Sequence, residues 1–331
     1  MPDVISLRQH AVSIAAIFLA LAVGMVLGSQ TLASGLLSGL RDDKSDLQHQ
    51  VDDLQGTNNQ LTHDLAAADE FNAATGGRVL HDALANRTVV VFSTPDADPG
   101  DVEGVTRAIV AAGGTSTGRV ALTQAFVDPA EADRLRTAVT NVVPAGVQLR
   151  TGAIDQGSLS GDLLGAVLLL PDGQPPLPDP DRDLVLNTMS SGGFITFPDG
   201  PARPAQLAVV ITGGATAPDS AGTADGSAAD GNVGAVVARF AAALDGRGLG
   251  SVLAGRLGSA LGSGPIAMVR ADSALTAATS TVDDVNRAAG RISTVLALQE
   301  QATGGSGRYG TGPKATAVTV GAAPAGGQPP A

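Results

Sequence analysis

The chain has 331 residues, of which 44% are hydrophobic and only 2% are aromatic, and its formal net charge is −12. A protein that binds nucleic acid needs a basic surface, so this charge argues against nucleic acid as a partner. The sequence contains no Cys, which excludes disulfide bonds, thiolate metal sites and a Cys nucleophile. The core must be built from Val, Leu, Ile and Ala, as in buried parallel strands and the helices that cover them.

The N-terminal region contains a candidate membrane helix. Residues 11–28 read AVSIAAIFLALAVGMVLG, without a charged side chain. At about 1.5 Å per residue, such a helix nearly crosses a hydrocarbon core of about 30 Å. We predict an N-terminal tail over residues 1–10 and an uncleaved transmembrane helix over residues 11–30. A cleaved signal peptide is the alternative, but its apolar region is usually only about 7–15 residues long. The short tail favours an envelope protein with a single membrane pass and its large domain outside the cytoplasm.

Small residues recur at every fourth position of this segment, at Ala16, Ala20, Gly24 and Gly28. A stripe of this kind lets two membrane helices approach each other closely. The alternative is that Gly and Ala are simply common in this chain.

A heptad pattern over residues 36–70 predicts a coiled-coil stalk. Its d positions include Leu40, Leu47, Leu54 and Leu61, and its a positions include Val51, Asn58 and Leu65. A polar Asn at an a position costs stability but favours a defined register and two strands. A single amphipathic helix packed on its own domain is the alternative, although such a helix usually has a wider apolar face. Together with the small-residue stripe, the pattern predicts a parallel homodimer.

Beyond residue 76, apolar runs of strand length alternate with helical stretches. This alternation predicts a Rossmann-like α/β domain with a mostly parallel sheet over residues 76–312. The predicted strands are residues 88–92, 120–122, 163–170, 194–197, 206–212, 251–254 and 266–269. The predicted helices are residues 101–112, 129–139, 181–190, 233–244 and 291–302. From their composition, we predict a flexible loop over residues 215–232 and a disordered tail over residues 313–331.

Four residues are weak candidates for binding a ligand or cofactor. Asp96 and Asp98 follow the first predicted strand, and Gly213 and Gly214 follow the strand at residues 206–212. Loops at the carboxyl ends of parallel strands are where α/β proteins bind ligands. Carboxylates there could hold a hard cation, and glycine amides could hold an anion. The alternatives are helix capping by Asp and a tight exit from the strand.

The remaining polar residues indicate neither a catalytic nor a metal site. The four histidines are His10, His49, His63 and His81, and no two of them have the spacing of a chelating pair. The sequence shows no catalytic triad and no convincing pair of carboxylates. We therefore predict a protein that is not an enzyme and needs no cofactor.

Segments spread along the chain resemble the mycobacterial copper-transport protein MctB family. They read VISLRQHAVSIAAIFLALAVGMVLGS, GGRVLHDALANRTVVVF, GDLLGAVLL, VARFAAAL, STVDDVNRAAGRI and RYGTG, and they span residues 4–312. The resemblance implies an actinobacterial cell-envelope protein that acts in copper efflux and homeostasis. A related corynebacterial protein, SteB, implies an alternative role, in which a dimeric scaffold controls cell-wall hydrolysis at division together with a SteA-like partner.

Overall fold

The structure is a computed structural model, and it describes residues 7–171, 173–214 and 226–321. Within its helices, the described side chains exclude those of residues 7–8, 28–43 and 226–232. The chain divides into two compact units, Met1–Ala68 and Asp69–Ala331.

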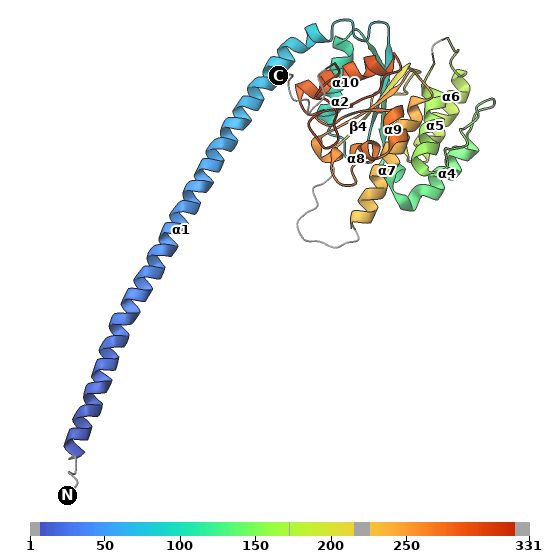
Figure 1. Cartoon of the computed structure of the whole chain (residues 1–331). Coiled ribbons are helices and arrows are strands. Elements are labelled where there is room, and N and C mark those ends of the chain that lie inside the picture. Colours follow the sequence, from blue (N-terminus) through green and yellow to red (C-terminus); the bar gives the residue numbers. More distant parts are fainter. Residues whose placement is uncertain (1–6, 172, 215–225, 322–331) are drawn as a thin grey trace. The chain divides into compact units, whose positions relative to one another are not determined.

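The first unit consists of one helix, α1 (Leu7–Val79), which continues without a break into the second unit (Figure 1). Its residues Gln9–Leu27 have a mean hydropathy of 2.3, and none of them is buried, so this stretch is long and apolar enough to cross a membrane. The predicted transmembrane helix and the predicted stalk are therefore both helical. The pairing of two stalks stays a prediction, because the structure contains a single chain.

The second unit, the head, is built on a sheet. Its described residues form seven strands in the order β3-β2-β1-β4-β5-β6-β7, all parallel to their neighbours except β3, which is antiparallel to β2 (Figure 1). The strands are β1 (Thr88–Ser93), β2 (Thr115–Leu122), β3 (Ile195–Thr196), β4 (Leu207–Thr212), β5 (Ser251–Gly255), β6 (Ser280–Val282) and β7 (Arg308–Tyr309). This topology confirms the predicted α/β class with a mostly parallel sheet.

Helices cover both faces of the sheet. They are α2 (Pro99–Ala111), α3 (Gln124–Val127), η1 (Pro129–Glu131), α4 (Ala132–Asn141), α5 (Gln156–Leu168), α6 (Asp179–Ser191), α7 (Gly226–Asp245), η2 (Leu257–Ala260), α8 (Pro265–Ala271), α9 (Ser273–Ala278) and α10 (Ala288–Gln301). Val89 and Val91 of β1 face a core shared with α2 and α10, whereas Val90 and Phe92 face a larger core shared with α5 and α7. Burial on both faces explains why these strands read as uninterrupted apolar runs.

The prediction of a strand at residues 163–170 was wrong, because α5 occupies most of this stretch. A helix reads as a continuous apolar run when it is buried on all sides, and Leu163, Leu164 and Leu168 are fully buried. Glycines let α5 approach α7 closely: a Cβ atom on Gly157 would lie 2.2 Å from the Val236 carbonyl oxygen.

The prediction of a strand at residues 266–269 was also wrong, because these residues belong to α8. Pro265 stands in the first turn of this helix, where its missing N–H and fixed φ are favourable. Ile266 and Val269 are both fully buried, and their spacing of three places them on one helical face. The sequence patterns missed β6 and β7, which are only three and two residues long.

Two predicted boundaries differ from the described structure. Helix α7 begins at Gly226, inside the predicted loop of residues 215–232, and residues 215–225 lie outside the description. Past residue 312 the chain still packs on the head, because Ala317 is 7% exposed and forms a parallel bridge with Tyr309. Residues 322–331 of the predicted tail lie outside the description.

Candidate functional site

The sequence-predicted candidates meet at the carboxyl edge of the sheet, between β1 and β4. From β1 the chain crosses to β2 on one side, and from β4 it crosses to β5 on the other, so this pair is the topological switch point where doubly wound sheets bind ligands. Asp96 and Asp98 follow β1, and Gly213 and Gly214 follow β4. The four candidate residues therefore lie at one edge of the sheet.

The two loops at this switch point pack directly on each other. A Cβ atom on Gly213 would lie 2.2 Å from the Asp96 carbonyl oxygen and 2.6 Å from its Oδ2. Thr94 fixes the first loop, since its Oγ1 donates to Asp96 Oδ1 and its N–H donates to the Ile211 carbonyl at 2.9 Å. A side chain at position 213 would therefore clash with Asp96, and the glycine serves close packing of the two loops.

Asp98 caps helix α2 and belongs to a cluster of opposite charges. Its Oδ1 accepts from the Gly100 N–H at 2.8 Å, and its Oδ2 lies 2.7 Å from Arg256 Nη2. The Gly100 amide, assisted by Arg256, holds the pKa of Asp98 below its ordinary value. Arg256 Nε also donates to Asp101 Oδ2 at 2.7 Å, and Arg291 Nη2 lies 3.7 Å from the other oxygen of Asp101.

This charge cluster joins three parts of the head at its carboxyl edge. Asp101 belongs to α2 and is 2% exposed, Arg256 follows β5, and Arg291 belongs to α10. A buried carboxylate needs such partners, because its desolvation would otherwise be costly. The arrangement holds loops and helices together, and capping by Asp98 confirms the structural alternative for that residue.

A second polar centre, which the sequence patterns missed, lies under the C-terminal segment. Arg270 of α8 and Asp283, just after β6, are both fully buried as side chains, and Arg270 Nη1 donates to Asp283 Oδ2 at 2.6 Å. Arg270 Nη2 donates to the Tyr309 carbonyl at 2.8 Å, and Nη1 also donates to the Pro313 carbonyl at 3.0 Å. The pair therefore ties the C-terminal segment to the sheet.

The segment RYGTG, residues 308–312, packs closely around the Asp283 carboxylate and donates backbone hydrogen bonds to it. Asp283 Oδ1 accepts from the Thr311 N–H at 2.9 Å and from the Gly312 N–H at 3.1 Å. A Cβ atom on Gly310 would lie 2.2 Å from this oxygen, and the φ of Gly310 is +121°, which strongly favours glycine. The acidic pair in STVDDVN and the glycines of RYGTG were the available sequence signals, but their contact depends on the tertiary fold.

Asp284 adjoins this centre, where the charged form of its carboxyl is unfavourable. Burial, followed by repulsion from Asp283, raises the pKa of Asp284 to about 6. Its Oδ1 has no hydrogen-bond partner among the described residues, and a Cβ atom on Gly290 would lie 2.6 Å from it. The side chain is packed against the first turn of α10, so it is not placed to reach a substrate.

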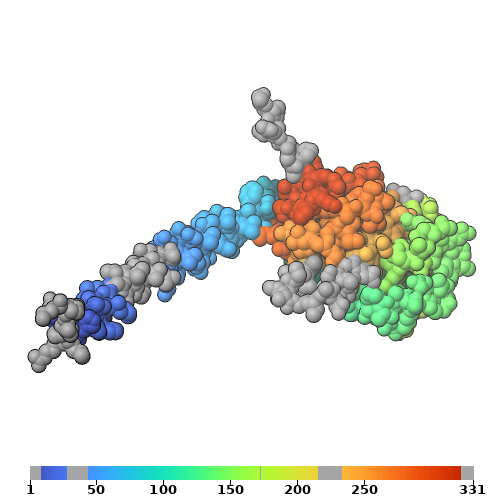
Figure 2. All heavy atoms as spheres, turned by 60° about the horizontal axis from the view of Figure 1, so that its bottom comes forward, coloured from blue at the N-terminus to red at the C-terminus, as the bar shows by residue number. Residues whose placement is uncertain are grey.

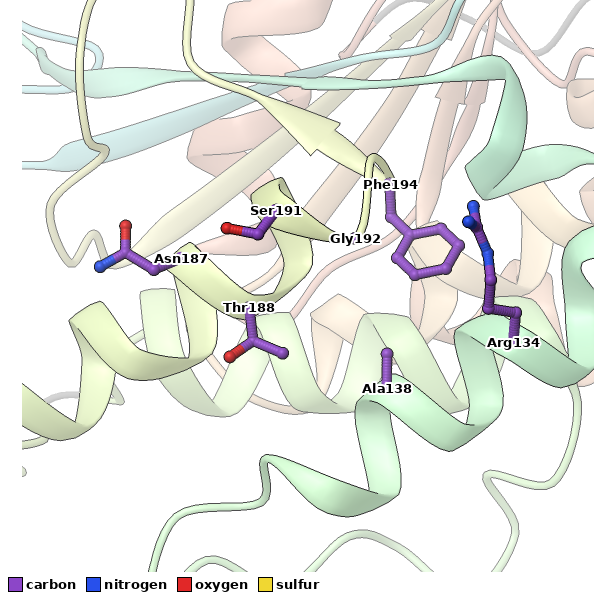
Figure 3. Close-up of a pocket in the computed structure, with 7 residues that line it drawn as sticks. All are labelled: Arg134, Ala138, Asn187, Thr188, Ser191, Gly192 and Phe194. Carbon is purple, nitrogen blue, oxygen red and sulfur yellow. The ribbon is translucent and has the colours of Figure 1, made fainter.

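A hollow of about 490 Å³ opens on the surface between α4 and α6 (Figure 3). The guanidinium of Arg134 lies 4.8 Å from the centre of the Phe194 ring and also pairs with Glu131, with 2.6 Å between Nε and Oε2. The other lining residues are uncharged: Ala138, Asn187, Thr188, Ser191 and Gly192. Among the lining residues only Arg134 carries a charge, and it is already paired with Glu131.

Ligands for a soft metal are scarce in the part of the chain that the structure describes. There, no group of three or more His, Cys, Asp or Glu side chains could hold a metal ion. His49 and His63 are exposed on α1, and His81 is exposed at the start of the head. Cu(I) prefers thiolate and thioether ligands, which this arrangement does not supply.

The residues predicted to mediate dimerisation lie along α1. Ala16, Ala20 and Gly24 are exposed, whereas the side chains of Gly28 and Leu40 fall outside the description. The described heptad residues are all exposed: Leu47, Val51, Leu54, Asn58, Leu61 and Leu65.

Comparison with known proteins identifies the family. Residues 4–320 match the family model described as "Copper transport outer membrane protein, MctB". "Copper transporter MctB" from Mycobacterium tuberculosis is 47% identical over 322 residues, which cover 96% of this chain and 99% of the relative. "Copper transporter MctB" from Mycobacterium leprae is 46% identical over 325 residues, with the same shares covered. The chain therefore belongs to the MctB family over nearly its whole length.

Proposed function

We propose that this chain is a membrane-anchored cell-envelope protein that acts in copper homeostasis. The observation that carries the proposal is the match to the MctB family over residues 4–320, whose mycobacterial members are named copper transporters. The apolar stretch Gln9–Leu27 supplies a membrane anchor. The alternative role with a SteA-like partner gains no support from these relatives and stays a prediction.

The head acts on the outer side of the membrane and does not catalyse a reaction. In the proposed orientation, the residues before the apolar stretch Gln9–Leu27 stay in the cytoplasm, and the bulk of the chain, which follows this stretch, lies outside it. In the described part of the head, the charged groups near the switch point neutralise one another, as Arg256 does with Asp98 and Asp101. These pairs support a structural role for the cluster.

The contribution to copper homeostasis does not depend on a tight Cu(I) site in the head. The chain lacks Cys, has four Met and four His, and groups no metal-binding set of His, Asp or Glu among its described residues. The described residues contain one candidate membrane helix, and a single helix cannot enclose a polar path across the hydrocarbon core. We therefore place the head's role in contacts with other envelope components that handle the ion.

Deletion of the gene in its own host tests the proposal. The deletion strain should become more sensitive to copper and accumulate more of it, and the full-length chain should reverse both effects. A version with the anchor, residues 1–30, replaced by a cleavable signal peptide should restore less tolerance, because its head is no longer attached to the membrane. Tolerance to zinc is the control. Unchanged copper sensitivity and copper content after deletion would refute the proposal.

A further inference from the structure

The stalk carries an apolar seam that nothing in its own unit covers. Every residue from 44 to 68 is exposed, including the large side chains of this seam, which is the row of heptad a and d residues. Figure 2 draws the atoms of this stretch in blue as a single rod. Leu47 is 61% exposed, Leu54 69% and Leu61 63%. Burying a Leu side chain is worth roughly 1.5–3 kcal/mol, so a row of them in water strongly favours a partner.

The seam has the geometry of a coiled-coil hole. A shallow hollow of about 460 Å³ lies on this face, bordered by Val51, Leu54, Gln55 and Asn58, together with Asn59. The first four have the relative positions i, i+3, i+4 and i+7, which are the four residues that surround one knob of a facing helix. In a parallel pair in register, that knob is Leu54 of the other chain.

The charges of the stalk favour a second copy as the occupant. The acidic residues Asp46, Asp52 and Asp53 occupy the outer positions b and c. The positions that flank the seam between residues 47 and 62 are uncharged: Gln48, Gln50, Gln55, Thr57 and Thr62. Between residues 47 and 62, two identical helices can therefore pair without like charges beside the seam, and only Lys44 at a and Asp64 at g, near the two ends of the segment, bring like charges together. A partner of opposite charge would find no complementary charge beside the central part of the seam.

We propose that residues 44–68 pair with the same residues of a second copy as a parallel, in-register, two-stranded coiled coil. Val51 at a with Leu at d favours two strands. Asn58 faces its counterpart and penalises any shift of register that would set it against Leu. The membrane segment, with its exposed Ala16, Ala20 and Gly24 on the same helix, suits the same parallel direction but does not carry the proposal.

Disulfide trapping in the full-length chain tests this pairing, since the native chain has no Cys. The variants Leu54→Cys and Leu61→Cys are oxidised in native membranes, and His63→Cys, at the outer position f, is the matched control. A disulfide needs Cβ atoms about 3.5–4.5 Å apart, which is feasible across a seam and excluded between outer positions. We expect abundant dimer at 54 and 61 and at least about tenfold less at 63.

Two further measurements make the test decisive. Mixing full-length chains that carry two different tags should yield crosslinked dimers with both tags, which identifies the partner as a second copy. Asn58→Leu should keep the crosslink at 54 while adding species larger than a dimer, because the residue that restricts register and strand number is lost. Only monomer at 54 and 61, equal crosslinking at 63, or a crosslink to a different protein would each overturn the proposal. None of these outcomes bears on copper tolerance.

Discussion

Replacing Asp283 with Ala should strongly destabilise the head. The change leaves the Arg270 guanidinium, whose side chain is fully buried, without its carboxylate partner. Removing one partner of a buried pair typically costs about 3–5 kcal/mol. The N–H groups of Thr311 and Gly312 also lose their acceptor, and each such loss costs about 1–3 kcal/mol when the group stays buried. The C-terminal segment should therefore detach from the sheet as well.

Thermal unfolding of the full-length protein in detergent, followed by circular dichroism, measures the effect. Each kcal/mol shifts Tm by about 2–4 °C in a domain of this size, so 3–5 kcal/mol corresponds to a fall of roughly 6–20 °C. Glu103→Ala is the matched control, because it removes an exposed pair with Arg107 that should contribute below about 1 kcal/mol. The double variant Arg270→Met with Asp283→Ala should recover part of the loss, since no charge is left unpaired. A fall in Tm no larger than that of the control would refute the reasoning.

Three further predictions address the pH dependence, the metal and the topology. Asp284→Asn should raise Tm at pH 7.5 and lose this advantage below about pH 4. In the parent protein the pKa of Asp284 is about 6 when folded and 3.8 ordinarily, so ionisation of this carboxyl as the pH rises destabilises the folded parent but not the variant. An equal gain in Tm at both pH values would contradict this. Full-length protein should bind Cu(I) weakly in a competition titration, whereas a stoichiometric site with a Kd below about 1 nM, or roughly −12 kcal/mol, would contradict the lack of soft ligands. A Cys at Val110, which is 60% exposed, should react with a membrane-impermeant maleimide in spheroplasts, whereas a Cys at Asp3 should react only after lysis; the reverse pattern would invert the proposed orientation.

Much of the fold could be predicted from local patterns, and the errors have a common physical cause. Periodicity separates strands from helices only when one face meets water, and α5 has no such face. Its glycines at 157, 161 and 165 were a usable signal, because spacing by four marks a helical face on which another backbone can lie. The short strands β6 and β7 are defined by pairing along the sheet, to which residues far apart in sequence contribute.

The candidate site was predictable in its location but not in its chemistry. Asp96 and Gly213 were each expected in a loop at the carboxyl end of a parallel strand, where α/β proteins bind ligands. Their direct contact, and the pairing of Asp98 with Arg256 across 158 positions of sequence, depend on how the loops pack. Sequence patterns cannot distinguish a glycine that leaves room for a ligand from one against which another loop packs.

The membrane anchor and the scarcity of soft metal ligands bear on how this family member could handle copper. An ion crossing a bilayer needs a continuous polar path, which a single helix cannot enclose, and the described residues contain one candidate membrane helix, Gln9–Leu27. The charged side chains at the described carboxyl edge are engaged with one another, and the chain offers few soft ligands for Cu(I). Pairing through the stalk would instead present two identical heads from one membrane anchor, an arrangement that increases the apparent affinity for a partner with two binding sites. Such pairing would strengthen the proposed contact of the head with another envelope component, whereas the copper role itself is tested separately, by the deletion strain.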